Sequence, residues 1–285
     1  MVYQWFPGHM TKAFRMMQED IKLIDLVIEL VDARAPMATR NPDIDRLGQG
    51  KARMIIMNKS DLADEKGNQQ WTEYFTAGGY TVVSINSRTG EGMNRIKAAI
   101  REACSEKIER DRKRGIKNRP VRAMVVGIPN VGKSTFINSL AGKAAAKTGN
   151  KPGVTKGKQW IRLNKDVELL DTPGVLWPKF EDQDIGRKIA FIGSINDEII
   201  QKHELAADLT AYLIKSPGKY PDVIKSRYEI EYDTLNNMEY VILENIAVAR
   251  KCLLKGGEPD IDRAAGILID DFRNGKLGRI TLELP

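Results

Sequence analysis

The stretch Gly127–Ser134, GIPNVGKS, constrains the fold more than any other feature of this chain. It lies directly between the apolar run AMVVG, which is typical of a buried strand, and STFINSL, which has a helical pattern. A glycine-containing turn that ends in Gly-Lys-Ser between a strand and a helix is the pattern of a phosphate-binding loop. Because this loop works only where a sheet strand meets a packed helix, we expect an α/β fold.

The residues of this loop have separable expected roles. Lys133 should reach the β- and γ-phosphate oxygens, as a binding and a catalytic residue, and the Ser134 hydroxyl should ligate Mg²⁺. Backbone N–H groups and the N-terminus of the helix should surround the phosphates. The remaining expected nucleotide contacts in the loop are Asn130, Val131, Gly132 and Thr135.

Short β-rich apolar runs alternate with helical patterns through the first 178 residues. The expected strands begin at Leu26, Arg53, Tyr80, Val121, Gln159 and Val167. The expected helices are Thr11–Ile24, Gly67–Ala77, Gly92–Arg110 and Lys133–Leu140. Alternation of this kind indicates a mostly parallel sheet with helices on both faces.

The strand signals stop after TPGVLWPKF, and long helical patterns follow at 197–214, 238–254 and 261–272. We therefore expect an α/β domain over 1–178 and a mainly helical domain over 179–285. One helical stripe indicates a face packed into a core, and by itself it indicates no more than packing. Its members are Ala264, Ile267, Leu268, Asp271 and Phe272.

A second motif, Asp171-Thr-Pro-Gly174, ends the expected strand VELLD downstream of the phosphate-binding loop. An aspartate here can hold Mg²⁺ through water, and the Gly174 N–H can sense a γ-phosphate. Sequences of the form D-x-x-G are common in turns, so the position of this one relative to the loop is what favours the functional interpretation.

A third motif, Asn58-Lys59-Ser60-Asp61, follows the expected strand RMIIM and predicts the base that is bound. A carboxylate accepts two hydrogen bonds, and guanine offers N1–H and N2–H₂, whereas adenine presents an acceptor at N1. Asp61 should therefore select guanine, with the aliphatic stem of Lys59 along the ring. Asn86-Ser87, after the next strand, can place a backbone N–H on the guanine O6.

The net charge of +7 is concentrated in two stretches of the chain. Residues 105–122 hold eight Lys or Arg against three acids, residues 143–165 hold seven against none, and everything else sums to −5. Concentrated positive charge is typical of a surface that meets a polyanion, although a solvated helix end and a loop are the simpler alternative. Residues 181–285 carry about −5, so charge does not mark them as a nucleic-acid binder.

Other features point to a cytoplasmic protein without a membrane segment. No apolar run approaches the roughly 18 residues of a membrane span, and the N-terminal residues lack the layout of a secretory signal. The two cysteines, Cys104 and Cys252, fit no metal-site spacing, so we expect reduced thiols.

The order of the motifs narrows the interpretation. The phosphate-binding loop, D-x-x-G, N-K-x-D and the O6 loop together resemble the translation-factor-related GTPases, but here the last two come first. With QWFPGHM, ELVDARAP and DTPGVLWPKF, this circular permutation resembles the ribosome biogenesis GTPase A family. The resemblance implies a slow GTPase that the ribosome stimulates. It would bind the maturing large subunit as the GTP form, promote a late assembly step, and leave on hydrolysis.

The resemblance also implies partners and further site residues. The helical C-terminal domain would contact rRNA. Apart from the resemblance, we expect a monomer, and we expect guanine alarmones to compete for the GTP site because they share guanine and a diphosphate with GDP. Thr155 resembles the switch threonine that closes on Mg²⁺ and the γ-phosphate, and Asn130 matches a position that helps to bind K⁺ in potassium-activated GTPases. The usual glutamine after D-x-x-G is replaced by Val175, and His9 is the family's substitute for orienting water.

Each of these assignments has a simpler alternative. For Thr155 the alternative is a threonine in a plain solvated loop, and for Asn130 it is an asparagine that only shapes its loop. For His9 it is a structural or exposed histidine. Two other functions also fit the sequence: an RNA-binding scaffold in which nucleotide only stabilises the fold, and a regulatory GTPase with a protein or membrane partner.

Overall fold

The computed structural model describes residues 6–116, 119–142, 159–178, 180, 182–215, 220, 222–232 and 239–285. The chain divides into two compact units. Residues 3–189 and 281–285 form one, here called the α/β unit, and residues 190–280 form the core of the other, the helical unit. We expected the division at 178, whereas the units divide eleven residues later and the last five residues belong to the α/β unit.

A six-stranded sheet with the order β3-β2-β1-β4-β6-β5 forms the centre of the α/β unit. All neighbouring strands are parallel except β5, which pairs antiparallel with β6. The strands are β1 (Leu26–Asp32), β2 (Ala52–Asn58), β3 (Thr81–Ser84), β4 (Val121–Val126), β5 (Gln159–Arg162) and β6 (Val167–Asp171). Every residue of β1 is buried, as a near-continuous apolar run predicts for a strand covered on both faces. The expected fold class is confirmed.

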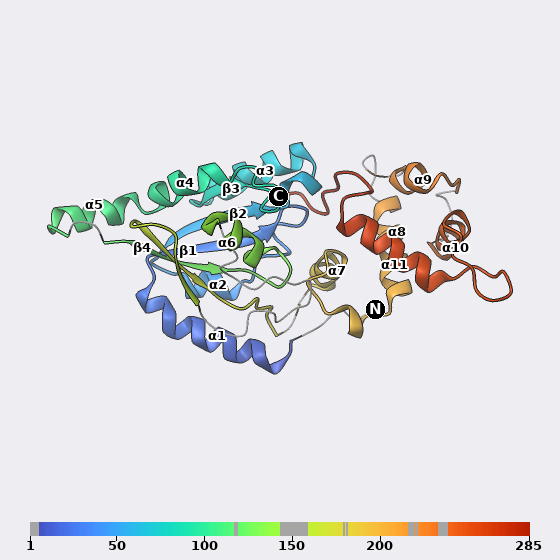
Figure 1. Cartoon of the computed structure of the whole chain (residues 1–285), viewed down its shortest axis with the longest axis horizontal. Helices are drawn as coiled ribbons and strands as arrows, with labels where there is room; N and C mark the ends of the chain where they lie inside the picture. The colour runs from blue at the N-terminus through green and yellow to red at the C-terminus, as the bar shows by residue number, and fades with distance from the viewer. Residues whose placement is uncertain are drawn as a thin grey trace. The chain divides into compact units, whose positions relative to one another are not determined.

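Helices flank this sheet: α3 and α4 run along one side of it and α1 along the other (Figure 1). The helices are α1 (Gly8–Asp20), α2 (Asp43–Leu47), α3 (Glu65–Ala77), α4 (Ile96–Ala103), α5 (Ser105–Lys113), α6 (Lys133–Ala141) and α7 (Gln183–Phe191). The single helix expected over 92–110 is interrupted at Cys104, and α5 continues α4 beyond the sheet.

The helical unit is built around α11, which packs against α8 and α10. Its helices are α8 (Lys202–Lys215), α9 (Val223–Tyr228), α10 (Glu239–Ala249) and α11 (Ile261–Arg273). The stripe expected on α11 is buried except at Ile267, which is only partly covered. The Asp271 carboxylate can be buried in this stripe because it forms ion pairs with Arg227 Nε at 2.8 Å and with Lys276 Nζ at 3.0 Å. Within the described residues, no helix is both long and apolar enough to cross a bilayer.

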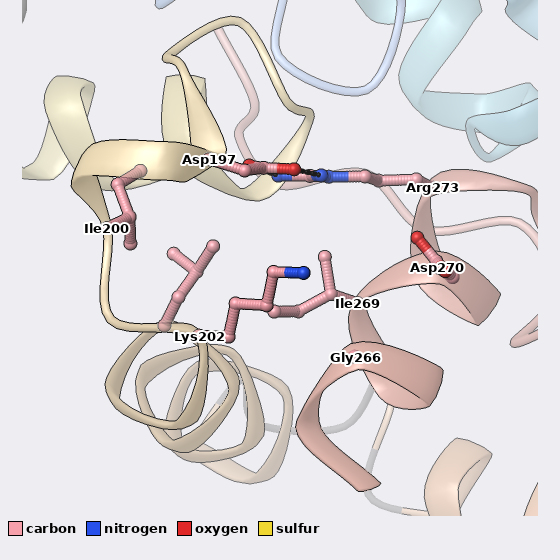
Figure 2. Close-up of a pocket in the computed structure, with 8 residues that line it drawn as sticks. Asp197, Ile200, Lys202, Gly266, Ile269, Asp270 and Arg273 are labelled. Atoms are coloured by element: carbon pink, nitrogen blue, oxygen red, sulfur yellow. Dashed lines mark hydrogen bonds and ion pairs between the residues drawn. The ribbon is translucent and has the colours of Figure 1, made fainter. Parts of the chain in front are cut away.

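Arg273 fastens the beginning of the helical unit to the end of α11. Its guanidinium meets the Asp197 carboxylate in a bidentate pair, with nitrogen–oxygen distances of 2.6 and 2.9 Å (Figure 2). It also donates to the carbonyls of Ala190 and Phe191. One side chain thus satisfies backbone acceptors at the end of α7, as a planar fork with several donors allows.

The last residues of the chain form part of the α/β unit. Thr281 exchanges hydrogen bonds with Asp64, the residue that precedes α3: its Oγ1 accepts from the Asp64 N–H and its own N–H donates to the Asp64 carboxylate. The Trp71 indole N–H donates to the Glu283 carbonyl at 2.9 Å. The Leu282 N–H donates to the Arg34 carbonyl at 2.7 Å. The C-terminal segment therefore holds the first turns of α3 in place.

Replacing Gly67 of α3 with alanine tests this packing. A Cβ at Gly67 would lie 2.7 Å from Thr281 Oγ1, so Gly67→Ala should destabilise the α/β unit by about 1–2 kcal/mol, although alanine favours helices. Denaturant unfolding of each unit measures the effect.

Gly266 of α11 is the matched control, because a Cβ there meets nothing within 4 Å. Gly266→Ala should stabilise the helical unit by about 0.5–1 kcal/mol through helix propensity alone. A Gly67→Ala protein as stable as the wild type would show that the C-terminal segment does not pack against α3 in solution.

Candidate nucleotide-binding site

The sequence motifs meet at one edge of the sheet. The phosphate-binding loop follows β4, Asp171 ends β6, Asn58 ends β2, and Asn86 comes shortly after β3. Because these four strands are parallel, their carboxyl ends lie at the same edge, which is where nucleotides bind in open α/β sheets. The site thus combines segments from both sides of the permutation.

Lys133 is folded back onto its own loop. Its Nζ donates to the carbonyls of Gly127 and Ile128, each at 2.9 Å, and its side chain is buried. Burial lowers the pKa of Lys133 to about 8, and the nearby Asp171 carboxylate only partly offsets this. A buried ammonium whose hydrogen bonds go to two carbonyl groups has much to gain from a phosphate.

Asp171 is buried beside Lys133, and neither of its carboxylate oxygens accepts a hydrogen bond of ordinary geometry from the part of the chain that the structure describes. Burial raises the pKa of Asp171 to about 6, against the lowering effect of Lys133. A buried carboxylate with open acceptor positions fits a hydrated Mg²⁺, which commonly uses one or two carboxylates together with substrate phosphates. Ser134, in the first turn of α6, would supply the hydroxyl ligand.

Asn58 bonds the phosphate-binding loop to the expected O6 loop. Its Nδ2 donates to the Val131 carbonyl at 2.7 Å, and its Oδ1 accepts from the Ser87 N–H at 3.0 Å. Gly132 has a φ of 96° and approaches this amide so closely that a Cβ would collide with Asn58 Nδ2. The glycine is therefore required for both its backbone conformation and its lack of a side chain.

Lys59 continues the contact between the motifs. Its backbone is left-handed, with a φ of 58°, and its Nζ donates to the Asn130 carbonyl at 2.8 Å. Asp61 lies in the short 3-10 turn Ser60–Leu62, and the Ser60 N–H donates to the Ile85 carbonyl, just before Asn86. The turn is thereby held beside the O6 loop, where a guanine edge is expected.

The O6 loop is organised by the Asn86 side chain. Its Oδ1 accepts from the N–H groups of Arg88 and Thr89, at 3.0 and 3.2 Å, and its own N–H donates to the Glu91 carbonyl. The N–H groups of Ser87, Arg88 and Thr89 all donate to side-chain oxygens. A guanine O6 that accepts from this loop would therefore share an N–H group with one of these oxygens. The contacts of guanine with Asp61 and with this loop stay predictions.

The segment after Asp171 approaches the phosphate-binding loop and then enters the core. A Cβ at Gly174 would lie 2.9 Å from Lys133 Nζ and from Pro129, so only glycine fits there. Val175 and Leu176 are buried, and neither side chain points into water. The residues that stand in place of the water-orienting glutamine therefore have side chains that face the core.

His9 lies in the first turn of α1 and is exposed. The neighbouring Met10 is buried, and its sulfur accepts from the Leu176 N–H at 3.4 Å. The beginning of α1 thus packs against the segment that follows D-x-x-G, and the role of His9 stays a prediction. Thr155 lies outside the described residues.

Sequence reasoning missed three buried polar residues beside the site: Asp32, Arg34 and Asn41. Asn41 Nδ2 donates to the Val175 carbonyl at 3.1 Å and so anchors the segment after D-x-x-G. Asp32 and Arg34 belong to ELVDARAP, a phrase that in the sequence contributes only to the family resemblance. The sequence did contain a signal for Asp32: it is an acid at the carboxyl end of an expected strand. In a parallel sheet that end of a strand faces the nucleotide site.

The helical unit contains a small cavity between the segment that precedes α8 and the face of α11 (Figure 2). Its volume of about 40 Å³ holds roughly three water molecules and no nucleotide. The residues that line it include Lys202, Gly266, Ile269 and Asp270. The candidate nucleotide site is therefore the sheet edge of the α/β unit.

Comparison with known proteins agrees with this geometry. A sequence model of the family described as 50S ribosome-binding GTPase matches residues 122–246, a stretch that begins at β4 and leaves out the N-K-x-D motif before it. The ribosome biogenesis GTPase A of Bacillus cereus is 46% identical over 285 residues, covering 100% of this chain and 95% of the relative. The chain belongs to the ribosome biogenesis GTPase A family. It is therefore a GTPase that acts in ribosome biogenesis, as the family resemblance of its sequence predicted.

More distant relatives extend the likeness. The ribosome biogenesis GTPase A of Thermotoga maritima is 34% identical and covers 99% of this chain and 94% of the relative. The solved structure of T. maritima YlqF with GNP bound has a TM-score of 0.65 at 31% identity, covering 96% of this chain and 98% of the other. A mixed α/β GTPase fold followed by a helical C-terminal region, with hydrolysis of GTP to GDP and phosphate, follows from these matches.

The lowered pKa of Lys133 predicts that nucleotide binding takes up protons. At pH 8.5 most of the empty protein lacks the Lys133 proton, and bound phosphates should raise this pKa again, so GDP binding should take up roughly three quarters of a proton. At pH 7 the lysine is already protonated and the uptake should fall below about a fifth of a proton.

Titration calorimetry in two buffers of different ionisation enthalpy, at constant Mg²⁺, measures the number of protons. The measurement at pH 7 serves as the control. Equal uptake at the two pH values would mean that the buried Lys133 is fully charged before nucleotide binds.

Proposed function

We propose that this GTPase binds the maturing large ribosomal subunit in its GTP form, in the cytoplasm and as a monomer, promotes a late assembly step, and leaves when the subunit stimulates hydrolysis. The family description, 50S ribosome-binding GTPase, supports the choice of subunit. The observation that carries the proposal is the direct chain connection between the γ-phosphate sensor and the helical unit.

That connection is short. Gly174 lies against Lys133, α7 begins at Gln183, and the helical unit begins within the last residues of α7. A GTPase switch changes conformation where γ-phosphate contacts are gained or lost. In the usual motif order this segment leads into the rest of the GTPase domain, whereas here the permutation directs it into a second unit. Nucleotide state can thus alter the helical unit, for which we propose contact with rRNA.

The helix α5 supplies a surface for RNA. Four basic residues near its end are exposed, and none makes an ion pair within the described chain: Arg110, Arg112, Lys113 and Arg114. Lys107, by contrast, is paired with Asp25 and Asp111. Clustered unpaired cations on an exposed helix are suited to a phosphate backbone, which they contact without reading sequence.

Ions and side chains complete the proposed catalytic site. Mg²⁺ would bind the Ser134 hydroxyl and a water molecule that Asp171 holds. In the GTP form, Thr155 would be a further ligand. K⁺ beside Asn130, whose backbone is left-handed with a φ of 61°, would add positive charge where the transition state needs it. His9 would orient the attacking water in place of the missing glutamine. Guanine alarmones share guanine and a diphosphate with GDP and would compete at the same site.

The test of this function is the rate of GTP hydrolysis in potassium buffer with and without purified large subunits. We expect stimulation of at least tenfold by large subunits and none by small subunits, with a lower rate when sodium replaces potassium. In the same assay His9→Ala should lose most of the stimulation while its affinity for GDP changes little.

The alternatives predict other results. A scaffold that uses nucleotide only for stability would bind subunits equally with GTP, GDP or no nucleotide. A GTPase with a membrane partner would bind anionic vesicles and show no stimulation by either subunit. Full stimulation of His9→Ala would remove this residue from the mechanism.

Charge reversal on α5 tests the proposed RNA surface. The variant Arg110→Glu/Arg112→Glu/Lys113→Glu should weaken large-subunit binding by at least tenfold and reduce its salt dependence, because fewer phosphate contacts release fewer counterions. Hydrolysis without subunits should not change. Sedimentation with subunits over a range of salt concentrations gives both quantities.

A control of equal charge change is Lys22→Glu/Lys66→Glu/Lys97→Glu, which reverses three exposed lysines on separate elements. It should bind nearly as well as the wild type. Equal losses in the two triple variants would assign binding to overall charge and not to α5.

A further inference from the structure

Asp32, the last residue of β1, and Arg34 form a fully buried ion pair at the edge of the sheet where the nucleotide motifs meet. Arg34 Nε and Nη2 donate to the two carboxylate oxygens of Asp32 at 2.9 and 2.8 Å. The Arg34 backbone N–H also donates to the carboxylate, at 3.1 Å. Two residues of the phrase ELVDARAP therefore lock each other into one geometry.

The same carboxylate holds the lysine of the N-K-x-D motif. Asp32 Oδ2 lies 2.9 Å from Lys59 Nζ, which also donates to the Asn130 carbonyl. The ammonium is thus held between the end of β1 and the phosphate-binding loop. With its ammonium held at two points, the aliphatic stem of Lys59 has few conformations left, which suits it to lie along a base.

The surroundings of Asp32 keep it charged. Its burial opposes ionisation, but the charges of Arg34 and Lys59 outweigh burial and hold its pKa well below the usual range. Thr39 Oγ1 accepts from the Asp32 N–H at 3.0 Å and fixes the backbone at this point. A buried charge pair is weak evidence for stability, because apolar residues of equal volume often stabilise as much. The geometry that this pair imposes on Lys59 is therefore its more informative property.

We propose that Asp32 and Arg34 are positioning residues for guanine recognition: Arg34 fixes the Asp32 carboxylate, and Asp32 fixes Lys59 against the base. This inference rests on the proposed contact of Lys59 with the nucleotide. It gives the ELVDARAP phrase a physical role that neither the phosphate-binding loop nor the guanine-selecting Asp61 supplies.

A double-mutant cycle on GDP affinity tests the proposal. Lys59→Met and Asp32→Asn should each raise the Kd for a fluorescent GDP analogue by about tenfold. The double variant should be no more than about twofold weaker than Lys59→Met alone, because Asp32 acts only through Lys59. In GTP hydrolysis, Asp32→Asn should raise KM by a larger factor than it lowers kcat, because Asp32 is argued to act on the lysine that lies along the base.

A second nucleotide separates positioning from selection. Hypoxanthine lacks the N2 amine that Asp61 is expected to read, so Asp32→Asn should weaken GDP and IDP by the same factor. Asp61→Asn should instead reduce the preference for GDP over IDP. Arg34→Lys, which keeps the charge and loses the bidentate fork, should fall between the wild type and Asp32→Asn in affinity.

The outcomes are distinguishable. An unchanged Kd in Lys59→Met would overturn the placement of Lys59 against the base, and with it this inference. A changed Kd in Lys59→Met with an unchanged Kd in Asp32→Asn, or with effects that multiply in the double variant, would overturn the inference alone. Thermal unfolding and the fraction of protein that binds nucleotide identify a folding defect, and in that case Arg34→Lys in the Lys59→Met background completes a second cycle.

Discussion

The Asn58 side chain joins the two parts of the site that the permutation separates in the sequence. One amide accepts from the Ser87 N–H and donates to the Val131 carbonyl, so the O6 loop and the phosphate-binding loop are bonded to a single group at the end of β2. Gly132 must lack a side chain to permit this approach. Lys59 adds a second bond to the same loop through Asn130. The parallel sheet makes these bonds possible, because it brings the carboxyl ends of β2, β3 and β4 to one edge whatever the order of the chain.

The site holds charges that are costly in the empty protein. Lys133 is buried against carbonyl groups, and the buried Asp171 oxygens accept no hydrogen bond of ordinary geometry from the described residues. Burial moves both pKa values toward the neutral forms. Phosphates and Mg²⁺ would stabilise the charged form of each group, so part of the binding free energy comes from relieving this cost. Asp32 shows the opposite design, since Arg34 and Lys59 already neutralise it. Lys133 and Asp171 thus have charges that a ligand would stabilise, whereas the role that we propose for Asp32 is to position Lys59.

The α/β unit holds both ends of the segment that forms the helical unit. The chain leaves through α7, and it returns at Thr281 to pack against α3. A single carboxylate connects these places: Glu283 accepts from the Ala38 N–H with one oxygen and pairs with Lys188 of α7 through the other. The loop that carries Ala38 also carries Arg34. The exit, the return and the loop beside the guanine motif are therefore bonded to one another within the α/β unit.

The amino-acid sequence by itself determined the fold class, all six strands and the family, because apolar periodicity and the spacing of the nucleotide motifs are local properties of the chain. It also predicted the residues that gather at the sheet edge, although their contacts with a nucleotide stay untested. Only the tertiary structure decided that the division between units lies after Ile189 and that Thr281 to Pro285 return to the first unit. It likewise decided that Asp32 and Arg34 meet Lys59, since this contact depends on how β1 lies beside β2. Periodicity and motif spacing indicate which segments are apolar and which residues are of a kind that binds nucleotide. A buried ion pair between neighbouring strands depends instead on sheet order and register, which no single segment encodes.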